Sequence, residues 1–234
     1  MEKLSSSIAE NLARCKEEIA NAALCVGRDP GEIELMAVTK TQTAQIVNQA
    51  IAAGVTLLGE NRAQELLGRY DEYLKDDVRI HFIGHLQTNK VKYITDKTQM
   101  IESVGSLKLA REINKQCERL KTSMEILIEV NIGREESKSG VLPENAELLI
   151  REIAQLDGVK IYGLMAIPPI FNSNSENEHF FAQMKQMQVD ISAKKIDNVN
   201  MEILSMGMSD DFALAIKHGS TRVRIGSAIF GKRQ

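Results

Sequence analysis

The sequence has few cysteines, and they are not arranged as metal ligands. Cys15, Cys25 and Cys117 are the only three in 234 residues, and they show neither a CxxC pattern nor the close spacing of a metal site. A sparse, odd set of cysteines is typical of proteins from a reducing compartment. The sequence therefore predicts no zinc or other metal site.

Long apolar runs and blocks of like charge are also missing. No run approaches the roughly 18 apolar residues that a membrane span requires, and the N-terminal MEKLSSSIAENLARC lacks the apolar core of a signal peptide. We therefore expect a soluble, cytoplasmic protein without membrane contact. Lys plus Arg number 29 against 32 for Asp plus Glu, with no basic block, so nucleic acid is not an expected partner.

What the sequence does contain is a regular alternation of short apolar runs with longer amphipathic segments. Eight runs are strand-like: IELMAVTK, VTLLGE, RIHFIG, QMIES, MEILIEVNI, VKIYGLMAI, NMEILSMG and TRVRIG. Eight mostly apolar strands that alternate with helices predict a closed parallel (β/α)8, or TIM, barrel. The rival is an open doubly wound sheet, which would place a GxGxxG turn after the first strand, but MAVTKTQTAQ has no glycine there.

A helix is predicted before the first strand. Ser7 and Glu10 form a capping-box pattern, and Ile8, Leu12 and Ile19 follow on one stripe. The stripe favours packing against the barrel over a partner surface. A chain of this length can bury one substantial core, so we expect residues 1–234 to form a single domain, with the helix of residues 1–30 packed on the barrel.

The active face of such a barrel is built from the loops after the strands. Lys40 is the first charged residue after LMAVT, and a lysine there is either a solvated terminator or a reactive amine. Barrels of this kind often hold phosphate between the loops after strands seven and eight. Those loops supply Ser209 and the pair Gly226 and Ser227. The alternative for Ser209 is a plain helix N-cap.

Two arginines alternate with apolar residues in the last strand, TRVRIG. If the apolar residues face the helices, Arg222 and Arg224 face the barrel interior, where an unpaired charge is costly. Glu129 or Glu202 is the expected partner of Arg222. Arg224, nearer the mouth, is expected to meet a ligand; the alternative is a purely structural ion-pair network.

A lysine, a phosphate-binding pair of loops and an arginine around one barrel mouth fit a phosphorylated carbonyl compound held as a Schiff base. Pyridoxal 5′-phosphate would use all three groups, with its aldehyde at Lys40, its phosphate at the last two loops and its ring nitrogen at Arg224. A sugar-phosphate aldolase would use only the first two.

Seven motifs, in this order over nearly the whole chain, resemble those of the pyridoxal phosphate homeostasis proteins: AVTK, GEN, HFIGHLQTNK, NIGREESKSG, GLMAI, LSMGMSDD and VRIGSAIFG. The resemblance implies a single-domain barrel related to the N-terminal domain of alanine racemase. It also implies that the cofactor is carried as an internal aldimine, without established catalytic turnover.

The resemblance assigns roles to particular residues. Lys40 of AVTK corresponds to the lysine that forms the covalent Schiff base. Ser209, Gly226 and Ser227 correspond to the phosphate-binding residues, and Arg224 to the arginine that faces the pyridine nitrogen.

Three further residues match motif positions with less defined roles. Asn61 of GEN is expected near the cofactor, although Asn61 with Gln64 also fits a helix cap. His85 is included among the expected cofactor-binding residues, and Lys138 matches a motif position without an assigned role.

Catalysis is not expected. An arginine at the ring nitrogen leaves that nitrogen unprotonated and the ring a poor electron sink. Alanine racemases also use a tyrosine from a C-terminal domain, which this sequence lacks, and the four tyrosines here fall in predicted helices or a strand. We therefore expect a monomeric protein that buffers pyridoxal phosphate or delivers it to apo-enzymes. The alternatives are an amino-acid racemase and a Schiff-base aldolase.

Overall fold

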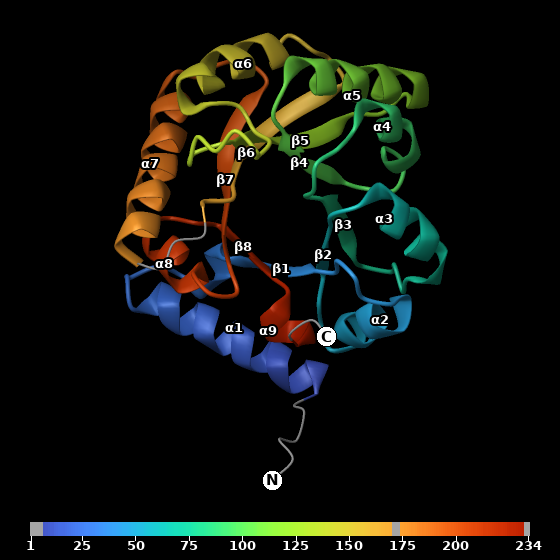
Figure 1. The fold of residues 1–234 in the computed structure, drawn as a ribbon, viewed down its shortest axis with the longest axis vertical. Helices are drawn as coiled ribbons and strands as arrows, with labels where there is room; N and C mark the ends of the chain where they lie inside the picture. The colour runs from blue at the N-terminus through green and yellow to red at the C-terminus, as the bar shows by residue number, and fades with distance from the viewer. Residues whose placement is uncertain (1–6, 170–173, 232–234) are drawn as a thin grey trace.

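Eight parallel strands close into a barrel in the computed structural model, which describes residues 7–169 and 174–231. Each strand pairs with the next along the chain, and β8 pairs back with β1 (Figure 1). The strands are β1 (Glu34–Val38), β2 (Leu57–Glu60), β3 (Arg79–Phe82), β4 (Met100–Val104), β5 (Met124–Val130), β6 (Val159–Ala166), β7 (Val199–Met208) and β8 (Arg222–Ile225). The predicted (β/α)8 fold is confirmed. Six of the eight strand-like runs contain a whole strand, whereas β4 extends one residue beyond the end of QMIES and β7 extends one residue beyond each end of NMEILSMG.

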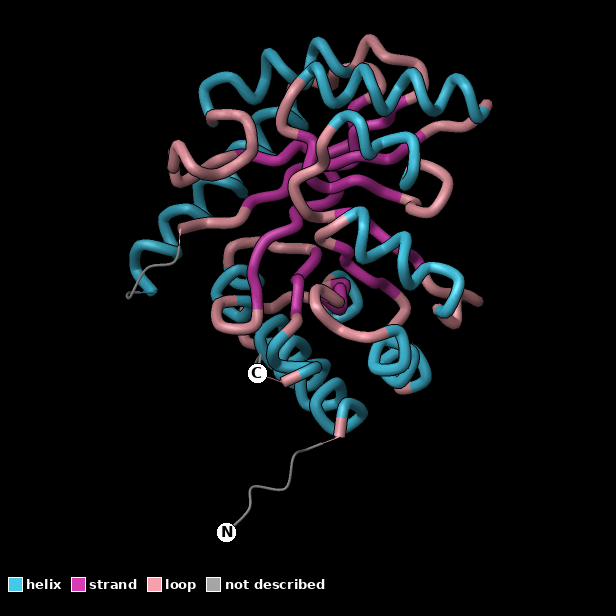
Figure 2. Tube along the Cα trace, turned by 45° about the vertical axis from the view of Figure 1, so that its right-hand side comes forward, coloured by secondary structure: helices cyan, strands magenta, loops and turns pink. Residues whose placement is uncertain are grey.

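Helices surround the ring of strands (Figures 1 and 2). They are α1 (Ile8–Leu24), α2 (Ala44–Ala52), α3 (Ala63–Arg69), α4 (Thr88–Ile94), α5 (Leu107–Leu120), α6 (Ala146–Ile153), α7 (Asn174–Ala193), α8 (Phe212–Lys217) and α9 (Ser227–Phe230), with short 3-10 turns η1 (Pro30–Glu32), η2 (Tyr70–Glu72) and η3 (Pro143–Asn145). None of the helices in the described ranges has the length and apolar character to cross a bilayer.

The helix that precedes the barrel begins as its sequence predicts. Ser7 caps α1, its hydroxyl accepts a hydrogen bond from the Glu10 N–H, and the Glu10 carboxylate accepts one from the Ser7 N–H. The helix packs against α8 and α9. Asn11 donates a hydrogen bond of 3.0 Å to the Ile229 carbonyl of α9, so the first helix holds the last one in place. Residues 1–6 of the predicted 1–30 segment lie outside the described residues.

The main apolar core lies between the strands and the helices, and the barrel interior is more polar. Register pairs Glu34 of β1 with Arg222 of β8, and Met36 with Arg224, so these four side chains share one face of the sheet. Because Val223 and Ile225 are fully buried in the outer core, the two arginines face inward, as the alternation of TRVRIG predicts.

Arg222 is neutralised inside the barrel by two carboxylates. It contacts Glu34 of β1 at 2.6 Å and Glu102 of β4 at 2.7 Å. Glu102 is completely buried, and it also contacts Nδ1 of His81 at 2.9 Å. These contacts tie β8 to its neighbour β1 and to β4 across the barrel.

The two acids proposed from the sequence as partners of Arg222 are therefore wrong. Glu202 is exposed, and the carboxylates that contact Arg222 are those of Glu34 and Glu102 instead. Glu129 is buried, but its carboxylate accepts a hydrogen bond from Ser139 beyond the end of β5. The vertical stagger of the strands decides which inward acid is level with Arg222, and the sequence does not specify that stagger.

The network also sets the protonation of its acid. Burial alone would raise the pKa of Glu102, but the Arg222 guanidinium, His81 and the Ser205 hydroxyl together lower that pKa to about 2. Because the folded-state pKa lies below the ordinary value of 4.5, the carboxylate stabilises the fold above about pH 4.5. That contribution is lost as the pH falls toward 2.

Glu102→Gln is expected to lower the free energy of unfolding at pH 7 by about 3 kcal/mol, since it removes one partner of a buried ion pair. The difference from the unmodified protein should shrink as the pH falls from 4.5 toward 2. Urea unfolding at several pH values measures both effects. Glu202→Gln makes the same charge change on an exposed strand position and should shift stability by less than about 0.5 kcal/mol. An equal loss in the two variants would contradict the assignment.

Candidate functional site

A cavity of about 460 Å³ opens at the carboxyl ends of the strands. Six of the seven residues expected to bind the cofactor line it: Lys40, Asn61, Ser209, Arg224, Gly226 and Ser227. They come from the loops after β1, β2, β7 and β8 and from β8 itself. The fold thus brings together side chains that are up to 187 positions apart in the sequence.

Lys40 follows β1 in a turn with unusual backbone geometry. Thr41 has a φ of 66°, which is rare for a β-branched residue and signals local strain. Its N–H donates a hydrogen bond of 3.0 Å to the Glu65 carboxylate at the start of α3. The turn that carries Lys40 is therefore held from the neighbouring β2–α3 unit.

Arg69 fixes the same turn from a second side. Its guanidinium donates to the backbone carbonyls of Thr39 and Gln42 and forms a 2.9 Å ion pair with Glu60. Glu60 is fully buried, and it also accepts a 2.6 Å hydrogen bond from the Tyr73 hydroxyl. The glutamate of the GEN motif thus positions the Lys40 loop, a role that sequence reasoning missed because Arg69 is not part of any motif.

Arg224 lies at the bottom of the cavity and is only 3% exposed. Its guanidinium donates to the Ser205 hydroxyl and to the Ala166 carbonyl, each at 2.8 Å. Burial lowers the pKa of Arg224, and the negative charges of Glu102 and Asp211 oppose that shift. Both of these acceptors are neutral, and no carboxylate among residues 7–169 and 174–231 forms an ion pair with this cation.

The loops after β7 and β8 meet beside α9. The Ser209 hydroxyl accepts a 3.5 Å hydrogen bond from the Ala228 N–H. Asp211 occupies the N-cap position of α8, so the alternative of Ser209 as a helix cap is wrong. Gly207 has a φ of +93°, and a Cβ there would lie 2.6 Å from Cβ of Ala215, which explains the need for glycine at that turn.

Asn61 lines the cavity and does not cap a helix. Arg62 occupies the N-cap position of α3, without a side-chain cap, so the Asn61–Gln64 cap is wrong. The Asn61 side-chain oxygen is buried and has no hydrogen-bond partner among the described residues. Buried polar atoms are rarely left unpaired in native proteins, so this atom is suited to a ligand in the cavity.

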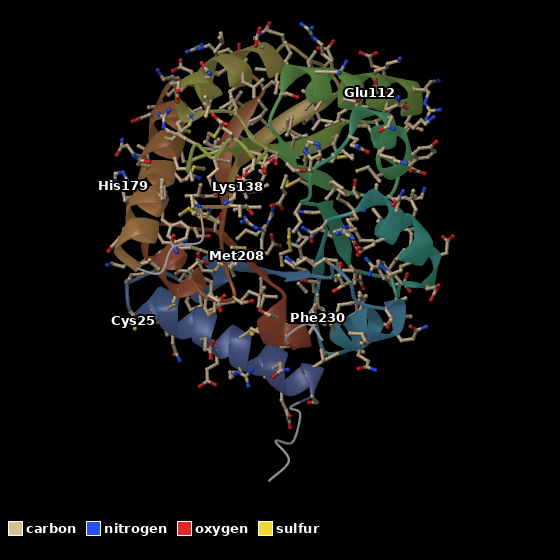
Figure 3. All side chains as sticks on the ribbon, viewed as in Figure 1. Cys25, Glu112, Lys138, His179, Met208 and Phe230 are labelled. Atoms are coloured by element: carbon tan, nitrogen blue, oxygen red, sulfur yellow. The ribbon has the colours of Figure 1, made fainter. Side chains whose placement is uncertain are left out.

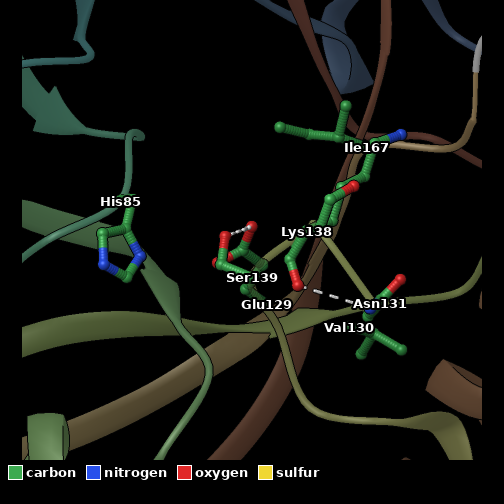
Figure 4. A pocket seen from close by; sticks show the side chains of 8 residues that line it. His85, Glu129, Val130, Asn131, Lys138, Ser139 and Ile167 are labelled. Atoms are coloured by element: carbon green, nitrogen blue, oxygen red, sulfur yellow. Dashed lines mark hydrogen bonds between the residues drawn. The ribbon is translucent and has the colours of Figure 1, made fainter. Parts of the chain in front are cut away.

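His85 does not line this cavity, unlike the other six residues. It is exposed and borders a neighbouring pocket of about 540 Å³, together with Glu129 and Ser139 (Figure 4). Lys138 and Ile167 line both spaces. The loop after β3 therefore borders both spaces, with Ile83 at the main cavity and His85 at the adjoining pocket.

Glu129 is the unusual group of this second pocket. It is 6% exposed, and Oε1 accepts a 2.9 Å hydrogen bond from Ser139. Its other carboxylate oxygen has no partner among the described residues. Burial raises the pKa of Glu129, although Ser139, Arg224 and His85 act in the opposite direction.

Some chemically active side chains lie away from both spaces. Figure 3 places Lys138 and Met208 inside the ring of helices, whereas Cys25, Glu112 and His179 lie at its outer edge. Within residues 7–169 and 174–231, no three His, Cys, Asp or Glu side chains form a group that could hold a metal ion. The chemistry available at the cavity is that of an amine, a buried guanidinium, hydroxyls, backbone N–H groups, the Asn61 amide and the Asp210 carboxylate.

Comparisons with known proteins point to one family. The family described as "Alanine racemase, N-terminal domain" matches residues 7–234. A protein of Aquifex aeolicus named pyridoxal phosphate homeostasis protein is 40% identical over 226 residues, covering 96% of this chain and 98% of the relative. A relative of the same name in Pseudomonas aeruginosa is 39% identical over 97% of this chain and 96% of its own length.

Solved structures agree with the sequence comparisons. PipY of Synechococcus elongatus, in a structure with pyridoxal phosphate bound, superposes with a TM-score of 0.84 at 30% identity, covering 96% of this chain and all of that one. An alanine racemase of Clostridium difficile has a TM-score of 0.75 at 16% identity. This chain covers 57% of that racemase, and the likeness shows a shared fold.

Glu129→Gln is expected to stabilise the protein at pH 7. A carboxyl group whose pKa is raised in the folded state destabilises the fold at pH values where it is ionised in the unfolded chain. The destabilisation vanishes below the pKa that this carboxyl group has in the unfolded chain. Urea unfolding should show a gain at pH 7 larger than the 0.5 kcal/mol typical of surface substitutions, and a smaller gain near pH 4. A loss of stability at pH 7 would show that the charged form is favoured by contacts in the fold.

Proposed function

Because this chain belongs to the family of pyridoxal phosphate homeostasis proteins, we propose that it holds its cofactor in the cavity between Lys40 and Arg224. The chain binds pyridoxal 5′-phosphate and acts in the homeostasis of that cofactor. This location of the cofactor rests on one observation: a lysine, a buried arginine and the loops after β7 and β8 line the same cavity.

The residues present fit the chemical groups of the cofactor. Lys40 supplies the amine that bonds the aldehyde, and the strained turn at Thr41 fixes its approach. Ser209, Gly226 and Ser227 offer hydroxyls and close backbone N–H groups to a phosphate. Arg224 would hold the ring nitrogen, and the side-chain oxygen of Asn61, which has no hydrogen-bond partner among the described residues, would accept a hydrogen bond from a polar group of the ligand.

The role proposed here is non-catalytic. When bound, the cofactor supplies a reactive aldehyde and a conjugated ring able to accept electrons. A guanidinium beside the ring nitrogen does not protonate it and so limits electron withdrawal. None of the four tyrosines, all within the described residues, lines the cavity, so no tyrosine is in place to move a proton at the substrate carbon.

Buffering and delivery are the forms of homeostasis that this arrangement supports. A cavity open at the barrel mouth allows the cofactor to enter and leave. We propose that residues 1–234 act as one domain and as a cytoplasmic monomer, with pyridoxal-phosphate-dependent apo-enzymes as recipients.

Lys40→Ala is expected to abolish covalent attachment. The purified protein should absorb visible light as a yellow chromophore, and borohydride followed by peptide mass mapping should place the reduced adduct on Lys40. Lys138→Ala is the matched control, because Lys138 lines the same cavity, and it should retain the chromophore. An adduct mapped to Lys138 alone would contradict the assignment.

Racemisation by the loaded protein is expected not to exceed that of free pyridoxal phosphate. The protein is incubated with single L-amino acids, and the D-isomer is measured by chiral chromatography at equal cofactor concentration. Turnover well above the free cofactor would replace the non-catalytic proposal with a racemase.

A further inference from the structure

The pocket beside the cofactor cavity has a binding chemistry of its own. It has a volume of about 540 Å³ and shares Lys138 and Ile167 with the larger cavity. His85 lies across it from Glu129 and Ser139 (Figure 4). None of the proposed contacts to pyridoxal phosphate uses the Glu129 carboxylate.

Glu129 is a buried carboxylate with half of its hydrogen-bonding capacity unused. The Ser139 hydroxyl donates to Oε1 at 2.9 Å, whereas Oε2 is buried without a partner in the described part of the chain. An ionised carboxylate at a site 6% exposed requires donors on both oxygens. The missing donor has to come from whatever occupies the pocket.

The cations of the neighbourhood are engaged elsewhere. Lys138 forms an ion pair with Glu135 and donates to the Pro168 carbonyl at 3.3 Å. Arg224 donates to Ser205 and Ala166. Neither cation therefore donates a hydrogen bond to Oε2, and Arg224 acts on Glu129 only at a distance.

We propose that this pocket is a subsite for small molecules that carry a primary ammonium group. Such a group brings the positive charge and the N–H donors that Oε2 lacks, and charge-assisted hydrogen bonds of this kind are among the stronger ones. Ile167 offers an apolar surface for a short alkyl chain. A divalent cation is a poor fit, since it needs several oxygen ligands, and Glu129 supplies the only carboxylate that lines the pocket from the described part of the chain.

The subsite goes beyond cofactor binding and does not depend on it. Because the two spaces share a wall at Lys138 and Ile167, a bound ammonium compound lies beside the cofactor cavity. Small primary amines and amino acids belong to the predicted ligand class.

The test is isothermal titration of the full chain, freed of cofactor, with propylammonium chloride at constant ionic strength. Tetramethylammonium chloride is the control ligand, because it has the charge but no N–H donor. Glu129→Gln keeps the shape of the side chain and removes its charge. Glu136→Gln, an exposed position on the loop after β5, is the matched control for the charge change.

We expect saturable binding of propylammonium that is at least about tenfold weaker in Glu129→Gln and unchanged in Glu136→Gln, with tetramethylammonium at least about tenfold weaker than propylammonium. Equal affinities in Glu129→Gln and the unmodified protein would overturn the proposal, as would a titration without saturable heat. Since the titration uses cofactor-free protein, its failure is distinguishable from a failure of cofactor binding.

Discussion

The ion pair of Arg222 with Glu34 and Glu102 is the constraint on which the barrel interior depends. A guanidinium placed inside the strands has to be neutralised, and the two carboxylates do so at 2.6 and 2.7 Å. Glu102 also accepts a 2.7 Å hydrogen bond from Ser205, whose hydroxyl in turn accepts one from Arg224. The cation that lines the cavity is therefore positioned through the network beneath it.

The floor and the mouth of the barrel differ in whether their buried oxygens have hydrogen-bond partners. At the floor, the Glu102 oxygens contact Arg222, His81 and Ser205. At the mouth, Asn61 and Glu129 each keep a buried oxygen without a partner among the described residues. Fully satisfied polar networks make a fold rigid, whereas local violations concentrate where ligands bind. Two of the unsatisfied atoms thus mark the ligand-binding end of the barrel, although Gln116 and Asn177 also keep a buried oxygen without a partner among the described residues and line neither space.

The sequence was informative wherever a rule acts over a few residues. Apolar runs located the strands, and Ser7 caps α1 as the capping-box pattern predicts. Sequence reasoning gave the wrong contacts where these depend on how strands and loops far apart in the sequence are placed relative to one another. The partner of Arg222 is Glu102 and not Glu129, and the Ser209 hydroxyl meets α9 instead of capping α8. The membership of six predicted residues in one cavity followed from loop order, but the separate placement of His85 did not.

Arg222 and Arg224 stand two residues apart on one strand face and differ in what holds them. Carboxylates bind Arg222 directly, so its charge is cancelled within the protein. Arg224 is held by a hydroxyl and a carbonyl, which fix its direction without cancelling its charge. Its positive charge is thus available at the bottom of the cavity. A ligand with an electron-rich atom there can accept a hydrogen bond from the guanidinium and so offset the charge. Glu129 is the corresponding anion in the neighbouring pocket. Only one of its carboxylate oxygens accepts a hydrogen bond from the described residues, so its negative charge is available to a ligand with a positive group.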